Sequence, residues 1–362
     1  MKFHIPTRVF FGTGALSQAS PYIANLGIKA LIVTGRTSAR KSGALDDVMQ
    51  LLDSSGIKWH LHDRIGENPD LEMVISGKQD FLDHGCDFVI AIGGGSPIDA
   101  AKAISLAAAN DLDLDHIYDT ASFLYVFPLV AIPTTAGTGT EVTPYSVLTD
   151  ARPQKKAGFG SDLAFPAIAV IDPNYTISQP DQVTLNTGID ALSHLLEGIY
   201  SIKRNPLLYP LIFEGIRLII ENLPLASTTP DDYHARESLA KASMYGGMTI
   251  AHTSTTLHHS IGYPLTSVHN VPHGLANGIV LKPMMDLFYP AVSAILDRLW
   301  IYLGINRRQF YDWIDGLDMK ADLHLDEEFM AQRIPEVLAS RNMANNPFEV
   351  TAAQIRVIYQ SL

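Results

Sequence analysis

The chain has 362 residues, of which 47% are hydrophobic and 18% charged, a balance typical of a globular protein large enough for two domains. Its formal net charge of −12 argues against a nucleic-acid surface, which needs clustered basic residues, and against docking on an anionic membrane. The single cysteine, Cys86, excludes an intrachain disulfide. No apolar run approaches the length of a membrane span, and the first residues lack an apolar stretch of signal length. We therefore expect a cytoplasmic protein.

Short apolar runs alternate with helical patterns over the first half of the chain. The apolar runs predict strands at residues 30–34, 57–62, 87–92, 129–132 and 168–171. Helical periodicity falls between them, at residues 42–54, 71–84 and 97–109. This alternation predicts βαβ units in an open α/β sheet, so we expect residues 1–178 to form an α/β dinucleotide-binding domain.

After about residue 180 the pattern becomes helical. We expect helices at residues 184–200, 207–222, 235–251 and 274–288, the second of them closed by Leu223-Pro224. No convincing strand follows Asp172, and no low-complexity linker separates the halves. The sequence therefore predicts a second domain over residues 179–362 that is all helical and packs tightly against the first.

A glycine-rich turn, Gly93-Gly94-Gly95-Ser96-Pro97, follows the expected strand 87–92 and opens a helix. Ser96 and Asp99 have the spacing of a capping box, and Pro97 suits a first helical turn. Glycines let the backbone approach a ligand closely, and the free N–H groups of a helix start favour a pyrophosphate. The turn lacks the G-x-G-x-x-G spacing of an ordinary Rossmann site, and a tight strand–helix turn without a ligand is the alternative interpretation.

A second loop, residues 133–141, is dense in glycine and hydroxyl groups and follows the strand 129–132. Loops at the carboxyl ends of strands are where α/β folds bind ligands. The alternative interpretation is a solvated surface loop.

Four side chains have the types and spacing of a metal site: Asp190, His194, His259 and His273. Asp190 and His194 are four residues apart and share one face of a helix. Neutral imidazoles with one carboxylate suit a borderline divalent cation such as Fe²⁺ or Zn²⁺.

Five of the 13 histidines lie between His252 and His273, so they cannot all be ligands. His258 and His259 are neighbours that point in different directions on a helix, and at most one of them can face the metal. His252 and His269 are read either as ordinary polar residues or as cofactor contacts.

With these residues in place, the chain resembles the iron-containing (group III) alcohol dehydrogenase family over nearly its whole length. The resemblance rests on RVFFGTG at residues 8–14, GGGSPIDAAK at 93–102, PTTAGTGTE at 133–141, TGIDALSHLLEG at 187–198 and PHGLAN at 272–277. Its propanediol- and butanol-dehydrogenase-like members are closest in character. The resemblance implies an α/β nucleotide domain followed by an all-helical metal domain, a dehydroquinate-synthase-like architecture. It also implies a homodimer, and hydride transfer between NAD(P)H and a small alcohol or aldehyde whose oxygen is polarised by the metal.

The resemblance also implies site residues. The metal, Fe²⁺ or alternatively Zn²⁺, would be held by Asp190, His194, His259 and His273. The remaining expected contacts are with the cofactor. The diphosphate would lie against Gly94, Gly95 and Ser96, and the nicotinamide ribose near Asp99. The adenosine and nicotinamide would contact Thr134, Thr135 and Thr138, and Lys156 would lie near the cofactor.

Two positions depart from the family pattern. Many members carry a histidine four residues after the third ligand, proposed to help proton transfer, and here that position is Tyr263, which we include among the expected catalytic residues. A tyrosine can pass a proton, but its ordinary pKa of about 10 is poorly placed for a relay at neutral pH, and water, the ribose hydroxyl or His269 are the alternatives. NAD-preferring members tend to have an Asp after the second strand, whereas this chain has Gly35-Arg36-Thr37-Ser38 with Lys41 just beyond. A missing carboxylate beside cationic and hydroxyl groups favours a 2′-phosphate, so we predict NADP(H) over NAD(H).

Three alternative functions share parts of this pattern. A glycerol-dehydrogenase-like zinc enzyme has the same fold but relies on one Asp and two His, without His194. A dehydroquinate-synthase-like lyase also binds NAD and a metal, but it should carry clustered basic residues for a phosphorylated acid, and none are seen here. The third alternative is a non-catalytic binding protein. The intact set of metal-ligand positions argues against it.

Overall fold

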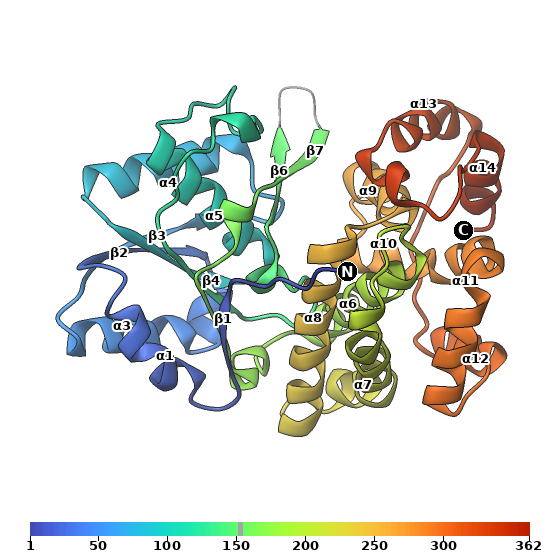
Figure 1. Ribbon diagram of the computed structural model, residues 1–362, viewed down its shortest axis with the longest axis horizontal. Helices are drawn as coiled ribbons and strands as arrows, with labels where there is room; N and C mark the ends of the chain where they lie inside the picture. Colours follow the sequence, from blue (N-terminus) through green and yellow to red (C-terminus); the bar gives the residue numbers. More distant parts are fainter. Residues whose placement is uncertain (151–154) are drawn as a thin grey trace.

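The computed structural model describes residues 1–150 and 155–362, and the side chains of residues 155 and 156 also lie outside the described part. A sheet-containing half, drawn in blue to green, lies beside a helical half, drawn in yellow-green to red (Figure 1). The expected α/β domain followed by a helical domain is confirmed.

A six-stranded parallel sheet forms the centre of the first half, in the order β1-β8-β5-β4-β2-β3. The strands are β1 (Arg8–Phe11), β2 (Lys29–Gly35), β3 (Lys58–Ile65), β4 (Phe88–Gly93), β5 (Leu129–Pro133) and β8 (Ile168–Ile171). Alternate residues of β4 contribute to separate hydrophobic clusters on the two faces of the sheet. This burial on both sides explains why the strand reads as a continuous apolar run.

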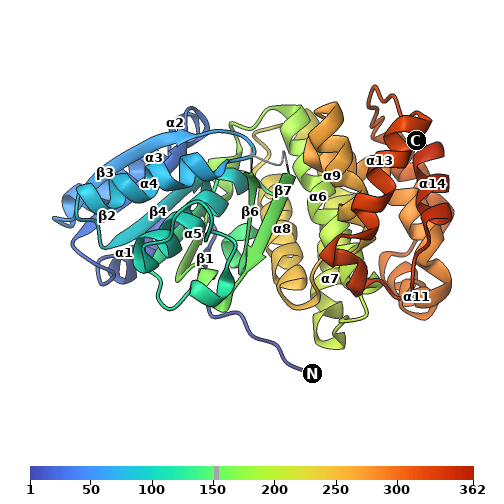
Figure 2. The same ribbon diagram turned by 90° about the horizontal axis from the view of Figure 1, so that it is seen from above.

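Helices cover both faces of the sheet. On one face lie α1 (Ala15–Ile23) and α3 (Ala44–Ser54), and on the other α4 (Leu71–Asp83) and α5 (Gly95–Asn110). The short α2 (Ser38–Lys41) precedes α3, so the single helix expected at residues 42–54 begins only at Ala44. Figure 2 shows these layers from above.

An antiparallel hairpin of β6 (Tyr145–Asp150) and β7 (Lys155–Gly160) was not foreseen from the sequence, nor was β1. The hairpin stands between the two halves in Figure 1. Most residues of β6 are only half-buried, so this strand lacks the continuous apolar run that identifies the central strands.

Among the described residues, only helices and 3₁₀ turns follow β8. The longer helices are α6 (Asp181–Tyr200), α7 (Tyr209–Thr228), α8 (Tyr233–Thr253), α9 (Leu257–His269), α10 (His273–Ile279), α11 (Leu281–Leu303), α12 (Arg307–Gly316), α13 (Glu327–Leu338) and α14 (Ala352–Gln360). A single hydrophobic cluster runs through them, with α6, α7 and α11 contributing the largest share.

Helix α7 passes through Pro224 and ends at Thr228, so the expectation that Leu223-Pro224 closes it is wrong. Proline cannot donate to the carbonyl four residues earlier, which is that of Ile220. In this protein that carbonyl accepts a hydrogen bond from the indole Nε1 of Trp313, at 3.2 Å. A side chain distant in sequence thus satisfies the group that the proline leaves free.

The helix expected at residues 274–288 is two helices, α10 and α11, which meet at Val280 with a bend of 56°. Helix α10 is therefore only seven residues long, and His273 is its first residue. Within the described residues no single helix has the length and hydropathy of a membrane span, although this bent pair would meet both criteria together.

The two halves touch where the hydroxyl-rich loop meets α8. Gly139 has φ +61°, and a β-carbon added to it would lie 2.5 Å from Cα of Gly247. A β-carbon added to Gly247 would in turn lie 2.3 Å from the carbonyl oxygen of Gly139. Two glycines are therefore required for this backbone contact.

Candidate metal and cofactor site

Three helices bring the four predicted metal ligands together. Asp190 and His194 lie on α6, His259 on α9, and His273 begins α10. Gly274 allows the start of α10 to approach α6, because a β-carbon there would lie 1.8 Å from the carbonyl oxygen of Asn186.

Three of the donors, from Asp190, His259 and His273, lie within 4.8 Å of one another, and His194 lies beside the first two. Oδ1 of Asp190 lies 3.7 Å from Nε2 of His259, 3.7 Å from Nε2 of His273 and 4.0 Å from Nε2 of His194. Nε2 of His194 is 3.1 Å from Nε2 of His259. Ligands around one tetrahedral ion, bound at about 2.1 Å, are about 3.4 Å apart. One carboxylate and three imidazoles at this spacing fit a borderline divalent cation.

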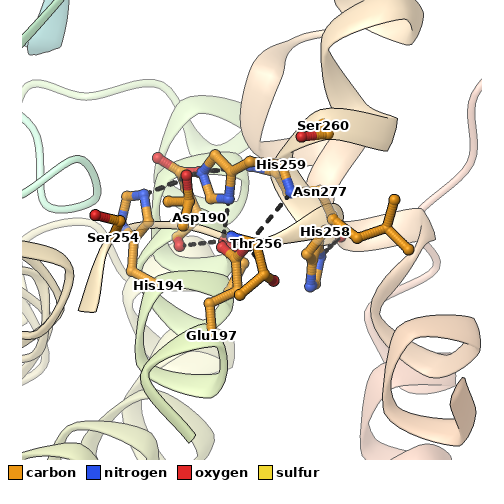
Figure 3. Close-up of polar contacts among 12 residues, drawn as sticks. Asp190, His194, Glu197, Ser254, Thr256, His258, His259, Ser260 and Asn277 are labelled. Atoms are coloured by element: carbon orange, nitrogen blue, oxygen red, sulfur yellow. Dashed lines mark hydrogen bonds and ion pairs between the residues drawn. The ribbon is translucent and has the colours of Figure 1, made fainter. Parts of the chain in front are cut away.

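Glu197, one turn beyond His194 on α6, fixes the orientation of His259. Its carboxylate accepts a short hydrogen bond from Nδ1 of the His259 ring, which leaves Nε2 with its lone pair directed toward Asp190. The other carboxylate oxygen accepts from the backbone N–H and the hydroxyl of Thr256, at 2.6 and 2.8 Å (Figure 3). Histidine ligands usually donate their second N–H in this way.

Asn277 lies beside the same donors. Its Nδ2 donates to Oδ1 of Asp190 at 2.9 Å and lies 3.2 Å from Nε2 of His259. Its backbone carbonyl accepts from Nε2 of His258 at 2.7 Å. His258 is therefore turned away from Asp190, as Figure 3 shows, and only one of the two adjacent histidines faces the group, as predicted.

The charge states of these residues suit metal binding. Burial opposes ionisation of both carboxylates, but neighbouring histidines outweigh it: the pKa of Asp190 falls well below its usual range, and that of Glu197 falls to about 2. Burial also lowers the pKa of His194, although Asp190 opposes this. The acids are thus ionised and His194 is neutral at neutral pH.

Tyr263 stacks on the ring of His273, with centroids 5.8 Å apart, and meets His259 edge-on. Burial, together with the nearby carboxylates of Glu197 and Asp190, raises the pKa of Tyr263 well above its usual range. The phenol therefore stays protonated at neutral pH.

His252 and His269, which the sequence left as either ordinary polar residues or cofactor contacts, both pack against aromatic side chains. His252 packs on Phe3 and accepts a hydrogen bond from the backbone N–H of His4. His269 packs against Phe329, with ring centroids 5.1 Å apart.

The glycine-rich turn and the hydroxyl-rich loop meet at the carboxyl ends of β4 and β5. A β-carbon on Gly94 would lie 3.2 Å from the Thr135 side chain, and one on Gly95 would lie 2.9 Å from that of Thr138. Oγ1 of Thr134 is buried and has no hydrogen-bond partner within the described chain. Bare backbone and an unsatisfied hydroxyl at the start of a helix fit a dinucleotide phosphate.

The predicted capping box at Ser96 and Asp99 is wrong. Helix α5 begins at Gly95, two residues earlier than expected, and its N-cap is Gly94. The carboxylate of Asp99 accepts instead from Oγ1 of Thr140, at 2.5 Å, and from the backbone N–H of Val147, at 3.0 Å. Asp99 thus joins the hydroxyl-rich loop to β6, while Pro97 lies in the first turn as expected.

The segment predicted to select the cofactor follows β2. Gly35 ends the strand and lies near the first turn of α5, since a β-carbon on it would lie 3.9 Å from Cγ of Pro97. Arg36 and Thr37 are exposed, and Ser38 and Lys41 are the first and last residues of α2. The side chain of Lys156, the remaining predicted cofactor contact, lies outside the described residues.

Sequence reasoning missed Glu197 and Asn277, although both carry a readable signal. Glu197 falls three residues after His194, and Asn277 four residues after His273. Each therefore shares a helix face with a predicted ligand.

Comparison with known proteins agrees with this arrangement. Residues 6–173 match the family model for iron-containing alcohol dehydrogenase, and residues 184–362 match that for the C-terminal part of the Fe-containing alcohol dehydrogenase family. A 1,3-propanediol dehydrogenase of Klebsiella pneumoniae is 34% identical over 76% of this chain and 72% of its own length. An NADPH-dependent butanol dehydrogenase of Clostridium saccharobutylicum is 32% identical over 78% of this chain and 72% of its own length.

Among solved structures, an iron-containing alcohol dehydrogenase of Thermotoga maritima superposes with a TM-score of 0.93 and is 37% identical, covering 99% of this chain and 98% of its own. Both halves of the chain, and the order of its elements, are accounted for by these matches. The chain belongs to the iron-containing alcohol dehydrogenase family and is an iron-type alcohol dehydrogenase or aldehyde reductase.

Proposed function

We propose that this protein interconverts small to medium primary alcohols and aldehydes with NADP(H), using Fe²⁺ held by Asp190, His194, His259 and His273. The observation that supports the metal assignment best is the spacing of the four donors, with Oδ1 of Asp190 within 4.0 Å of all three imidazoles. Zn²⁺ accepts the same ligand types, and metal analysis of anaerobically purified protein separates the two.

The bound cation would act as a Lewis acid on the substrate oxygen, and the nicotinamide would carry the hydride. The chain itself supplies geometry. The side chains of Asp190, His194 and His259 are almost completely buried, whereas that of His273 is partly exposed. Substrate would therefore reach the predicted metal site on the side of His273. Glu197 keeps the ring of His259 in one tautomer and one orientation.

The phosphates of the cofactor would lie on the start of α5. The N–H groups at Gly94, Gly95 and Ser96 are at the positive end of a 16-residue helix. Thr134, with its unsatisfied hydroxyl, lies beside them on the hydroxyl-rich loop, and Thr135 and Thr138 pack on the glycines.

The proposed preference for NADPH rests on Arg36. This exposed side chain follows the end of β2, next to the turn that would hold the diphosphate, and no carboxylate occupies residues 35–38. An arginine here would pair with a 2′-phosphate. A homodimer remains an expectation from the family resemblance.

The test is a spectrophotometric assay of the iron-loaded protein with a panel of aldehydes of increasing chain length. We expect NADPH oxidation with short to medium primary aldehydes, and a kcat/KM for NADPH above that for NADH. Loss of all turnover after chelation, restored by Fe²⁺, would support the metal. A tenfold preference for NADH would overturn the cofactor assignment, and full turnover in metal-free protein would overturn the metal assignment.

A further inference from the structure

A second group of metal-binding side chains lies in the α/β half, away from the first. His60 is on the edge strand β3, Asp80 is near the end of α4, and His84 caps the same helix. One donor atom from each lies within 4.8 Å of the others. His60 is the third residue of its strand, so the group lies toward the amino-terminal ends of the parallel strands, whereas the glycine-rich turn is at their carboxyl ends.

The His84 ring is held in the tautomer that a ligand needs. Its Nδ1 lies 2.9 Å from the backbone carbonyl oxygen of Asp80. A carbonyl oxygen can only accept, so Nδ1 carries the hydrogen and Nε2 presents its lone pair. This is the pattern in which metal-binding histidines donate their second nitrogen to a carbonyl or carboxylate.

A third histidine, His62, orients the carboxylate of Asp80 from the buried side. Nδ1 of His62, whose side chain is fully buried, is 2.8 Å from Oδ2 of Asp80, and the same oxygen lies 3.8 Å from Nε2 of His60. Although burial opposes it, the bond from His62 lowers the pKa of Asp80, so the group is a carboxylate at neutral pH. The arrangement gives a carboxylate ligand with its own supporting hydrogen bond.

The two outer imidazoles are already in contact. The rings of His60 and His84 stack with centroids 3.5 Å apart and planes 14° from parallel. Burial and the nearby His84 lower the pKa of His60, which keeps that ring neutral. A shared cation would require the exposed His84 ring to turn out of this stack so that both lone pairs point to one place, with the Nδ1 bond to the Asp80 carbonyl adjusting to the new orientation.

We propose that His60, Asp80 and His84 form a second cation site, which binds a borderline divalent ion of the Zn²⁺ type and ties the end of α4 to the edge strand β3. Two imidazoles and one carboxylate are the ligand set that such ions prefer over Mg²⁺ or Ca²⁺. Three protein ligands on a partly exposed surface leave a coordination position for water.

The test uses the holoenzyme with its catalytic metal already loaded. Zn²⁺ is added, bound zinc is measured by equilibrium dialysis with elemental analysis, and iron is measured in the same samples. We expect one additional Zn²⁺ per chain without loss of iron, and a rise in the melting temperature. His84→Ala and His60→Ala should each weaken this uptake about tenfold or more and abolish the thermal shift, while keeping the unliganded protein folded.

His116→Ala is the matched control, because His116 is an exposed histidine that also pairs with an aspartate, Asp113, but belongs to no group of three close donors within the described part of the chain. It should bind zinc like the wild type. Zinc uptake that is absent in the wild type, unchanged in both variants, or accompanied by an equal loss of iron would overturn the proposal. Mg²⁺ added in place of Zn²⁺ should give no uptake at this site.

Discussion

Glu197 and His259 come from different helices, yet the carboxylate of one accepts the Nδ1 hydrogen of the other inside the protein core. The same carboxylate also accepts from the backbone N–H of Thr256, the residue that precedes α9. The buried carboxylate of Glu197 therefore holds both the first turn of α9 and the orientation of the His259 ring, which α9 contributes to the predicted metal site.

Replacing Glu197 by Gln should weaken metal binding. The amide has a single acceptor oxygen, so either the ring of His259 or the Thr256 N–H loses its partner. Loss of such a supporting group typically costs 10–100-fold in metal affinity. Competition with a chelator of known affinity measures it. Glu214→Gln, on the surface beside Arg217, is the control, and an unchanged affinity in Glu197→Gln would contradict the assigned role.

Removing His194 separates two modes of metal binding. In the four-ligand site, His194→Ala should lose most of the bound metal and most of the activity. If Asp190, His259 and His273 suffice, as in the glycerol-dehydrogenase-like alternative, the variant should keep its metal. Elemental analysis of the purified variant decides between them, with the exposed His234→Ala as a control for histidine loss in general.

Tyr263→Phe should leave the pH dependence of turnover in place. Because burial raises the pKa of this phenol well above its usual range, it does not exchange its proton near neutral pH. The ring remains available to stack on His273 after the substitution. The check is a kcat/KM profile from pH 6 to 9 for both proteins. Disappearance of a limb of the profile in the variant would instead assign Tyr263 to proton transfer.

Glu141 should make the protein less stable as pH rises. Burial raises the pKa of this carboxyl from about 4.5 to about 7, so between these values the folded state holds a proton that the unfolded state has released. The free energy of unfolding should then fall by roughly 1.4 kcal/mol per pH unit across that window and level off above it.

The measurement is the difference in unfolding free energy between wild type and Glu141→Gln at several pH values, which cancels the contribution of all other groups. A difference independent of pH between 5 and 8 would show that Glu141 is ionised throughout.

Lys102 is a buried cation whose removal should destabilise the α/β half. Its ammonium donates to Oγ1 of Thr140 at 2.6 Å and to the carbonyls of Thr140, Thr143 and Tyr145 at 2.7–3.0 Å. Lys102→Met would leave these acceptors without a donor and Asp99 without its neighbouring positive charge. The free energy of unfolding should fall by about 3 kcal/mol or more. Urea unfolding measures the loss. Lys58→Met, on the exposed start of β3, should change stability by less than about 0.5 kcal/mol.

The sequence was most informative where one physical requirement dominates. Strands buried on both faces, such as β4, have to be apolar throughout, and they were found almost to the residue. The four predicted ligands could be proposed from the sequence because few residue types can bind a borderline cation, and the spacing of Asp190 and His194 on α6 narrows the choice further.

What could not be predicted depends on partners that are distant in the chain. Pro224 stays within α7 because Trp313 satisfies the carbonyl that it frees, and no local pattern reveals that bond. Asp99 has the spacing of a helix cap, yet it bonds to Thr140 and Val147, more than 40 residues away. Glu197 and Asn277 were missed for a different reason: an acid or an amide becomes notable only after the ligand that it supports is placed.

The meeting of Gly139 with Gly247 limits how the enzyme can open to exchange its coenzyme. The peptide backbones of the two halves touch there with no room for a methyl group, so this point cannot act as a sliding surface. If the two halves move relative to one another, the displacement should be smallest at this contact and largest far from it. An alanine at either position would act as a wedge, holding nucleotide and metal apart even when each half is correctly folded.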